Sequence, residues 1–145
     1  MARTGSAFLL DTNVVSETTK QVPAPAVLAW LGRQDAFHLS SVTVFELARG
    51  IEVLPSGKKR VFLEAWLAKL LAHGSVVHAF DEAESLLAAK LEADARRGGR
   101  TVDLRDLFIV ATARVANLSV ATRNIAHFRG YGVVVFDPFT GEESL

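Results

Sequence analysis

The chain has 145 residues, about the commonest size of a single domain, and half of them are apolar, which allows a sizeable core and argues against a disordered chain. Its 16 Lys and Arg balance 16 Asp and Glu, which argues against a protein that binds long nucleic-acid duplexes by net charge alone. It has no cysteine, which excludes a disulfide framework, a thiolate zinc site and a cysteine nucleophile.

Short apolar runs alternate along the chain with stretches in which apolar residues recur at helical spacing. In chain order, these patterns predict a strand over 7–10, a helix over 23–31, a strand over 37–39, helices over 42–53 and 60–72, a strand over 76–79, helices over 82–96 and 104–116, and strands over 119–121 and 133–136. Prolines open the first helix, Ser40 or Ser41 precedes the second, and Asp81 precedes the fourth, as expected of residues that begin helices. Gly98 and Gly99 end the fourth.

This alternation is typical of a three-layer α/β fold, in which helices cover a short central parallel sheet of about four to five strands. We find no repeat and no long linker, which predicts a single domain over residues 1–145, with a core at about 7–139 and a C-terminal tail at 140–145. In such folds ligands bind beyond the carboxyl ends of the strands, so the residues that follow each strand are the first candidates for a site.

The apolar runs are too short for a membrane protein, since none reaches the roughly 18 residues that a membrane span needs. Asp11 interrupts the first run at once, which argues against a signal peptide. Together with the lack of cysteine, this predicts a cytoplasmic protein without membrane contact.

Three carboxylates occupy positions where a site is expected. Asp11 directly follows the first strand, although Asp-Thr-Asn also suits a turn or a helix cap. Glu46 stands among apolar helical residues, where a carboxylate is costly unless it is exposed, is paired with a residue such as Arg49, or binds a cation. Asp106 lies at the start of a helix with Asp103 one turn earlier, and the helix dipole alone would favour acids there. Three carboxylates on separate elements, without a His or Cys cluster, favour a hard cation such as Mg²⁺.

Four segments give the chain a resemblance to a known family. They are, in order, residues 8–17 (FLLDTNVVSE), 40–50 (SSVTVFELARG), 106–113 (DLFIVATA) and 122–128 (TRNIAHF). In content, order and spacing these segments resemble the PIN-domain ribonucleases, and among them the VapC-like and FitB-like toxins of bacterial type II toxin–antitoxin pairs. The resemblance covers about residues 7 to 139 and implies the PIN-like, Rossmann-like form of the three-layer fold.

The resemblance implies that Asp11, Glu46 and Asp106 are catalytic and bind the metal. A fourth catalytic position, often acidic in the family, falls on Asn124, and this departure leaves one charge fewer for a second metal ion. Many relatives also carry Asp where this chain has His127.

Five further residues are weaker candidates for the site. Thr12 and Thr122 resemble neighbours whose hydroxyls bond to ligands or waters. Arg123 is a candidate for contact with phosphate. Glu17 and Asp103 are candidates for acids outside the metal's direct ligands.

The implied activity is that of an endoribonuclease, which hydrolyses RNA phosphodiester bonds with Mg²⁺, or with Mn²⁺ in its place, and needs no protein nucleophile. Such toxins inhibit translation, usually dimerise and are neutralised by a small DNA-binding antitoxin, so RNA, a second copy and an antitoxin are the expected partners. Two alternatives stay open. One is a non-catalytic PIN-like module that binds RNA or a protein, and the other is a PIN nuclease that acts on DNA or structured RNA outside any such pair.

Two further features bear on partners. Four arginines between residues 96 and 105 predict either a basic rim for the RNA backbone or a solvated helix end, and we favour the second for Arg96 and Arg97. Large apolar residues at 30–31 and 66–71 exceed what a core of short strands needs. Most of them should be core, and the remainder would form a homodimer face or a groove for a partner helix.

Overall fold

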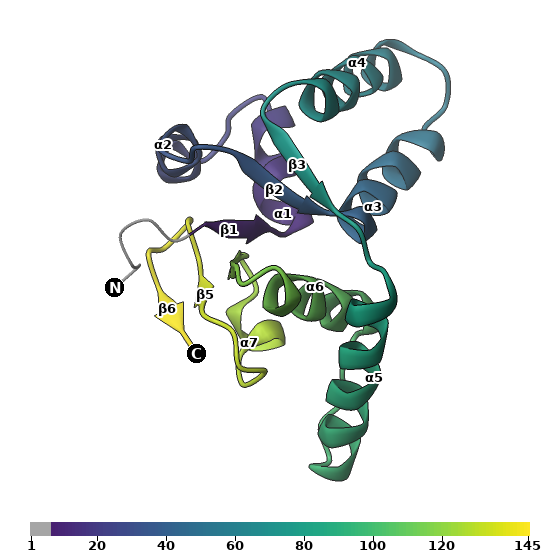
Figure 1. The fold of residues 1–145 in the computed structure, drawn as a ribbon. Helices are drawn as coiled ribbons and strands as arrows, with labels where there is room; N and C mark the ends of the chain where they lie inside the picture. Colours follow the sequence, from purple (N-terminus) through teal and green to yellow (C-terminus); the bar gives the residue numbers. More distant parts are fainter. Residues whose placement is uncertain (1–6) are drawn as a thin grey trace.

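The computed structural model describes residues 7–145, which fold into three layers around a six-stranded sheet (Figure 1). The strands are β1 (Phe8–Leu10), β2 (Phe37–Ser40), β3 (Ser75–His78), β4 (Ser119–Ala121), β5 (Val135–Phe136) and β6 (Glu143–Ser144). Their order across the sheet is β3-β2-β1-β4-β5-β6. All neighbouring strands are parallel except β5 and β6, which are antiparallel. The predicted α/β class with a mostly parallel sheet is confirmed.

Helices connect the strands, and α1, α3, α5 and α6 begin at a residue whose side chain caps them. They are α1 (Thr12–Val15), the 3₁₀ helix η1 (Ser16–Thr19), α2 (Pro25–Gly32), α3 (Ser41–Glu52), α4 (Lys58–Ala72), α5 (Glu82–Arg97), α6 (Leu104–Val115) and α7 (Ile125–Phe128). The Ser40 side chain accepts a hydrogen bond from the N–H of Val42 and so caps α3. Asp81 and Glu84 form a capping box at the start of α5.

Some elements differ from the prediction because they are too short to leave a periodic pattern. The sheet has one strand more than the four to five predicted, since residues 140–145, expected as a tail, include β6. The turn before β6 is closed by a hydrogen bond from the N–H of Gly141, at φ 84°, to the carbonyl of Asp137. Helices α1 and α7 span four residues each, about one helical turn, and the residues after Asp11, expected as a polar turn, form α1.

The core has two parts, one on each face of the sheet, because successive side chains of a strand point to opposite faces. Leu9 packs among residues of α5, α6 and α7 on one face. Phe8 and Leu10 pack among residues of α1 to α4 on the other. The central strand β1 is therefore apolar throughout, as expected of a strand in a parallel sheet with both faces covered.

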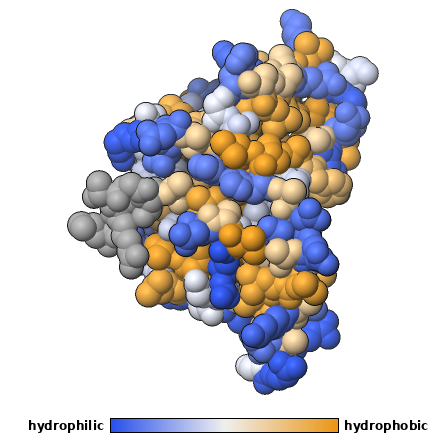
Figure 2. Space-filling view, viewed as in Figure 1, coloured by the Kyte–Doolittle hydropathy of each residue, from blue (hydrophilic) through white to orange (hydrophobic). Residues whose placement is uncertain are grey.

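Helix α4 lies at the margin of the fold and leaves apolar surface exposed. Of the large residues predicted to exceed the core, Trp30 and Leu31 are buried, whereas Leu71 is 39% exposed. A cleft of about 230 Å³ between α3 and α4 has apolar residues along most of its wall. Figure 2 shows apolar side chains gathered over β3, where Val76 and Val77 are also exposed. Within the described part of the chain, no helix combines the length and apolarity needed to cross a membrane.

Candidate metal centre

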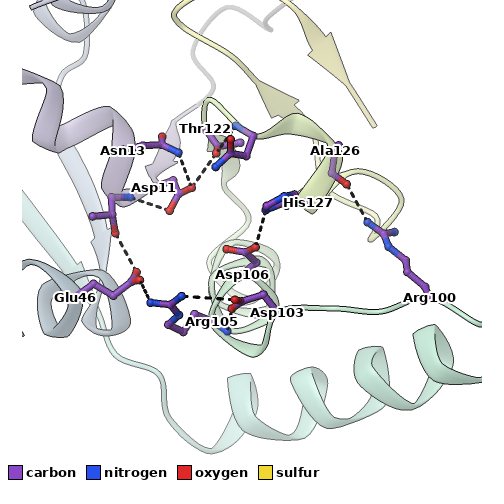
Figure 3. A network of polar contacts seen from close by, with 12 residues as sticks. Asp11, Asn13, Glu46, Arg100, Asp103, Arg105, Asp106, Thr122, Ala126 and His127 are labelled. Atoms are coloured by element: carbon purple, nitrogen blue, oxygen red, sulfur yellow. Dashed lines mark hydrogen bonds and ion pairs between the residues drawn. The ribbon is translucent and has the colours of Figure 1, made fainter.

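The carboxyl ends of three neighbouring strands bring the predicted site together. Leu10 pairs with Ala121 at the ends of β1 and β4, so the residues that follow, Asp11 and Thr122, lie side by side. The Thr122 hydroxyl donates a hydrogen bond of 2.8 Å to Oδ2 of Asp11. Helix α3, which carries Glu46, begins directly after β2, the neighbour of β1 on its other side. Parallel topology thus places side chains from three separate segments at one edge (Figure 3).

Asp11 is a buried carboxylate, with only 7% of the residue exposed. Its Oδ1 accepts a hydrogen bond of 2.8 Å from the N–H of Thr12, so the residue caps α1 as well as facing the site. Burial raises the pKa of Asp11 from 3.8 to about 6, against the opposing effect of its bonds from Thr122 and Thr12. The negative charges of Asp106 and Glu46 add to this rise, because they lie close enough to repel a charged Asp11.

Glu46 faces the same edge from α3, beside the buried stripe of that helix. Its Oε1 accepts a hydrogen bond of 3.0 Å from the Thr12 hydroxyl, and its Oε2 lies 2.9 Å from Nη1 of Arg105. The Glu46 side chain is 18% exposed. The cationic partner is therefore Arg105, which is 59 residues away in sequence, and not the nearby Arg49.

Asp106 reaches the site from the first turn of α6. Asp103 caps that helix by accepting a 2.8 Å hydrogen bond from the N–H of Arg105, and the Arg105 guanidinium lies 3.6 Å from the Asp103 carboxylate. Oδ2 of Asp106 lies 3.1 Å from Nδ1 of His127 on α7. Partial burial and the nearby Asp103 charge raise the pKa of Asp106, and His127 opposes the rise. Figure 3 shows Arg105 between Glu46 and Asp103, and His127 pointing toward Asp106.

Comparison with known proteins places this arrangement in a family. The family model of the PIN domain matches residues 8–132. The chain belongs to the PIN-domain family. Over 136 residues the domain is 37% identical to VapC ribonuclease Y4jK of Sinorhizobium fredii, which covers 91% of this chain and 97% of that protein. It is 36% identical to Toxin FitB of Neisseria gonorrhoeae over the same length, covering 91% and 98%.

Solved structures agree with this assignment. The crystal structure of FitAcB from Neisseria gonorrhoeae matches the PIN domain with a TM-score of 0.83 and 35% identity, covering 92% of this chain and 99% of the other. FitAB bound to an IR36 DNA fragment also matches with a TM-score of 0.83, at 33% identity and coverages of 93% and 97%. The predicted family, with its VapC-like and FitB-like members, is confirmed.

Two predicted residues of the PIN domain follow β4 and lie at the rim of the acidic centre, which is the set of Asp11, Glu46 and Asp106. The N–H of Asn124 donates a 3.0 Å hydrogen bond to the Thr122 hydroxyl, and the residue is exposed. The N–H of Arg123 donates to Oδ1 of Asn13 at 3.2 Å, while its guanidinium lies 4.4 Å from the ring centre of Phe139. Both side chains are therefore within the same segment as Thr122, and neither is buried.

Other candidates serve the fold. Glu17 is 4% exposed, and its carboxylate binds Lys20 at 2.8 Å and accepts a 2.8 Å hydrogen bond from the N–H of Ala24. It thus fixes the loop before α2. Arg100, considered for an RNA-binding rim, donates to the carbonyls of Ala126 and of the residue that follows α7, at 3.2 and 2.7 Å.

The chemistry of the three carboxylates fits a divalent cation. Asp11, Glu46 and Asp106 offer the carboxylate oxygens that Mg²⁺ and Mn²⁺ prefer, and their mutual repulsion, felt in the pKa of Asp11, is what a cation would relieve. Within residues 7–145, no group of three or more His, Cys, Asp or Glu side chains is close enough to hold a metal ion together. The Glu46 carboxylate contacts Thr12 and Arg105, and the Asp106 carboxylate contacts His127.

Sequence reasoning undervalued two contacts of the centre. The sequence predicts for Arg105 either a basic rim that contacts RNA or a solvated helix end. For His127 it indicates only a departure from the Asp that many relatives carry. Nothing local in the sequence indicates that Arg105 reaches Glu46 or that His127 reaches Asp106. The one available signal was the position of each, since Arg105 adjoins Asp106 and His127 lies three residues after Asn124.

Proposed function

We propose that this PIN domain is a metal-dependent endoribonuclease and the toxin of a type II toxin–antitoxin pair. The observation that carries the proposal is that Asp11, Glu46 and Asp106 face the same edge of the sheet from separate elements, near enough for the last two to raise the pKa of the first. Relatives that bear the names VapC ribonuclease and Toxin FitB support the activity and the role. A tRNA(fMet)-specific endonuclease VapC of Shigella flexneri, 29% identical, further supports RNA as the substrate.

The three carboxylates would hold the cation, which we propose to be Mg²⁺, with Mn²⁺ able to replace it. When bound, the cation supplies the positive charge that polarises a phosphodiester and activates an attacking water. The protein's own part is orientation. Thr122 and the N–H of Thr12 hold the two oxygens of Asp11, and the Thr12 hydroxyl holds Glu46 beside it.

The rim of the centre would meet the RNA. Arg123 and Asn124 are exposed beside Thr122, where a guanidinium and a neutral amide face solvent. Because Asn124 brings no charge, an approaching phosphate would meet less negative potential there than at a fourth carboxylate. We therefore assign Asn124 to substrate or water contact and Arg123 to the phosphate backbone.

We further propose that the partners are a small DNA-binding antitoxin and a second copy of this chain, and that the compartment is the cytoplasm. The solved relatives named FitAcB and FitAB, the latter bound to DNA, support an antitoxin partner. The exposed apolar residues of α4 and β3, and the cleft between α3 and α4, offer surface for such contacts.

The proposed activity is tested with purified, partner-free protein on a mixed pool of transfer, ribosomal and messenger RNA. Reactions contain Mg²⁺, Mn²⁺ or EDTA, and the variants are Asp11→Asn, Asp106→Asn and the control Asp35→Asn, an exposed acid on the loop before β2. We expect metal-dependent cleavage by the wild-type protein and the control, and none by the two site variants. Folded protein that cleaves no RNA, or cleavage that survives both site substitutions, would refute the proposal and favour a binding module.

A further inference from the structure

His127 is held beside the acidic centre by a firmly anchored segment. Its helix, α7, buries Ile125 and Phe128 in the core. The Arg100 guanidinium, on the loop before α6, donates to the carbonyl of Ala126 at 3.2 Å (Figure 3). It also donates to the carbonyl of Arg129 at 2.7 Å. The imidazole is therefore placed by the packing of α7, although its own side chain is 59% exposed.

The contact between His127 and Asp106 opens on a cleft. This cleft measures about 400 Å³ and is lined by the loop before α6, by the first turn of α6 and by α7, with Arg100, Asp103, Asp106 and His127 in its wall. It has room for a cation that keeps several of its waters, as Mg²⁺ and Mn²⁺ do in protein sites. The two side chains thus meet at an accessible surface and not in the dry core.

The distance between the two groups suits a shared cation. Neighbouring ligands of an octahedral ion with bonds of about 2.1 Å lie about 3 Å apart. Nδ1 of His127 and Oδ2 of Asp106 are 3.1 Å apart. This contact is a hydrogen bond, and it places an imidazole nitrogen directly beside one of the three carboxylates.

We infer that His127 is a direct ligand of the metal held by Asp106, and that this nitrogen shifts the preference of the centre from Mg²⁺ toward Mn²⁺. The inference rests on the proposed function, because it concerns the same metal. Imidazole nitrogen suits transition metals, whereas Mg²⁺ strongly prefers oxygen ligands, so one imidazole among carboxylates raises the affinity for Mn²⁺ relative to Mg²⁺ above that of an all-oxygen set.

The experiment uses Mn²⁺ itself as the probe and does not depend on cleavage. Pulsed electron paramagnetic resonance of Mn²⁺ bound to the full-length protein detects the ¹⁴N hyperfine coupling of a directly coordinated imidazole. The variants are His127→Ala, Asp11→Asn and His38→Ala. The last is the matched control, since Nδ1 of His38 lies 2.9 Å from Nε2 of His78 on β3, away from the acidic centre, and this pair is a second place where Mn²⁺ could meet nitrogen.

We expect a ¹⁴N coupling in the wild-type protein that persists in His38→Ala and disappears in His127→Ala. Titration calorimetry should show Mn²⁺ affinity reduced at least about tenfold by His127→Ala, with a smaller loss for Mg²⁺, since even outer partners of metal ligands cost that much. His127→Asp should restore Mg²⁺ binding and lower the ratio of Mn²⁺ to Mg²⁺ affinity.

The outcomes separate this inference from the proposed function. Mn²⁺ that binds, is lost in Asp11→Asn, and shows no ¹⁴N coupling would overturn the role of His127 and leave the metal centre standing. A coupling that survives His127→Ala would likewise overturn it. Failure of the wild-type protein to bind Mn²⁺ at all would overturn both.

Discussion

Replacing Asp11 by Asn is expected to stabilise the metal-free protein while it abolishes cleavage. The residue is 7% exposed, and burial, with the charges of Asp106 and Glu46, raises its pKa from 3.8 to about 6. The folded state therefore binds this proton more tightly than the unfolded chain, and stability falls as the pH rises from about 4 to about 6. Since one pKa unit corresponds to about 1.4 kcal/mol, the charged carboxylate costs the fold about 3 kcal/mol at neutral pH. An amide keeps the helix cap without that cost.

The assay is urea unfolding in EDTA at one fixed protein concentration, followed by tryptophan fluorescence. Asp11→Asn should exceed the wild-type protein in free energy of unfolding by about 3 kcal/mol at pH 7.5 and by about 1 kcal/mol at pH 4.5. Exposed Asp35→Asn is the control and should change neither value appreciably. Excess Mg²⁺ should then stabilise the wild-type protein and leave Asp11→Asn unchanged, because only a native-state ligand adds stability.

A lower stability of Asp11→Asn at pH 7.5 in EDTA would refute this reasoning. It would mean that the hydrogen bonds from Thr122 and from the N–H of Thr12 favour the carboxylate more than burial disfavours it. An advantage that stays constant from pH 4.5 to pH 7.5 would also refute it, since the effect would then not come from ionisation.

Three further substitutions test the surroundings of the centre. Arg105→Gln removes the guanidinium that binds Glu46, and calorimetry should show Mg²⁺ affinity raised by a factor of a few, as expected of an exposed ion pair. An unchanged affinity would show that Arg105 does not compete with the metal for Glu46. Thr122→Val removes a bond that lowers the pKa of Asp11, so the pH dependence of cleavage should move to higher pH, and no movement would contradict that role. Phe128→Ala opens the core beneath α7 and should lower the free energy of unfolding by about 3–5 kcal/mol in urea, whereas a loss below about 1 kcal/mol would contradict its burial.

The sequence predicts those elements that are long enough to repeat a pattern. The helix predicted over 82–96 is observed as Glu82–Arg97, and the strand over 119–121 is observed at those residues. Helix α7 is not predicted, because its four residues form about one helical turn and cannot repeat an apolar pattern. Strand β6 is not predicted either, because it consists of two polar residues, Glu143–Ser144, whose extended form depends on pairing with β5.

In the site, too, some features are predictable from the sequence and others are not. The position of Asp11 was predictable, since a parallel sheet presents the residue after a strand at its functional edge. The contacts of Glu46 with Arg105 and of Asp106 with His127 were not, because they join residues 59 and 21 positions apart and depend on how α3, α6 and α7 pack. Periodicity indicates which face of a helix is buried, but not which polar group of another helix it meets.

Each carboxylate of the centre has its own partner in the fold. A threonine hydroxyl bonds Asp11, a guanidinium binds Glu46, and an imidazole contacts Asp106. Metal binding is then an exchange in which Arg105 must leave Glu46, whereas His127 remains as a ligand beside Asp106. The two substitutions Arg105→Gln and His127→Ala should therefore move Mn²⁺ affinity in opposite directions. If each side chain acted only as a competing partner of its carboxylate, loss of either would strengthen cation binding, so the sign of the His127→Ala effect distinguishes a metal ligand from a competing partner.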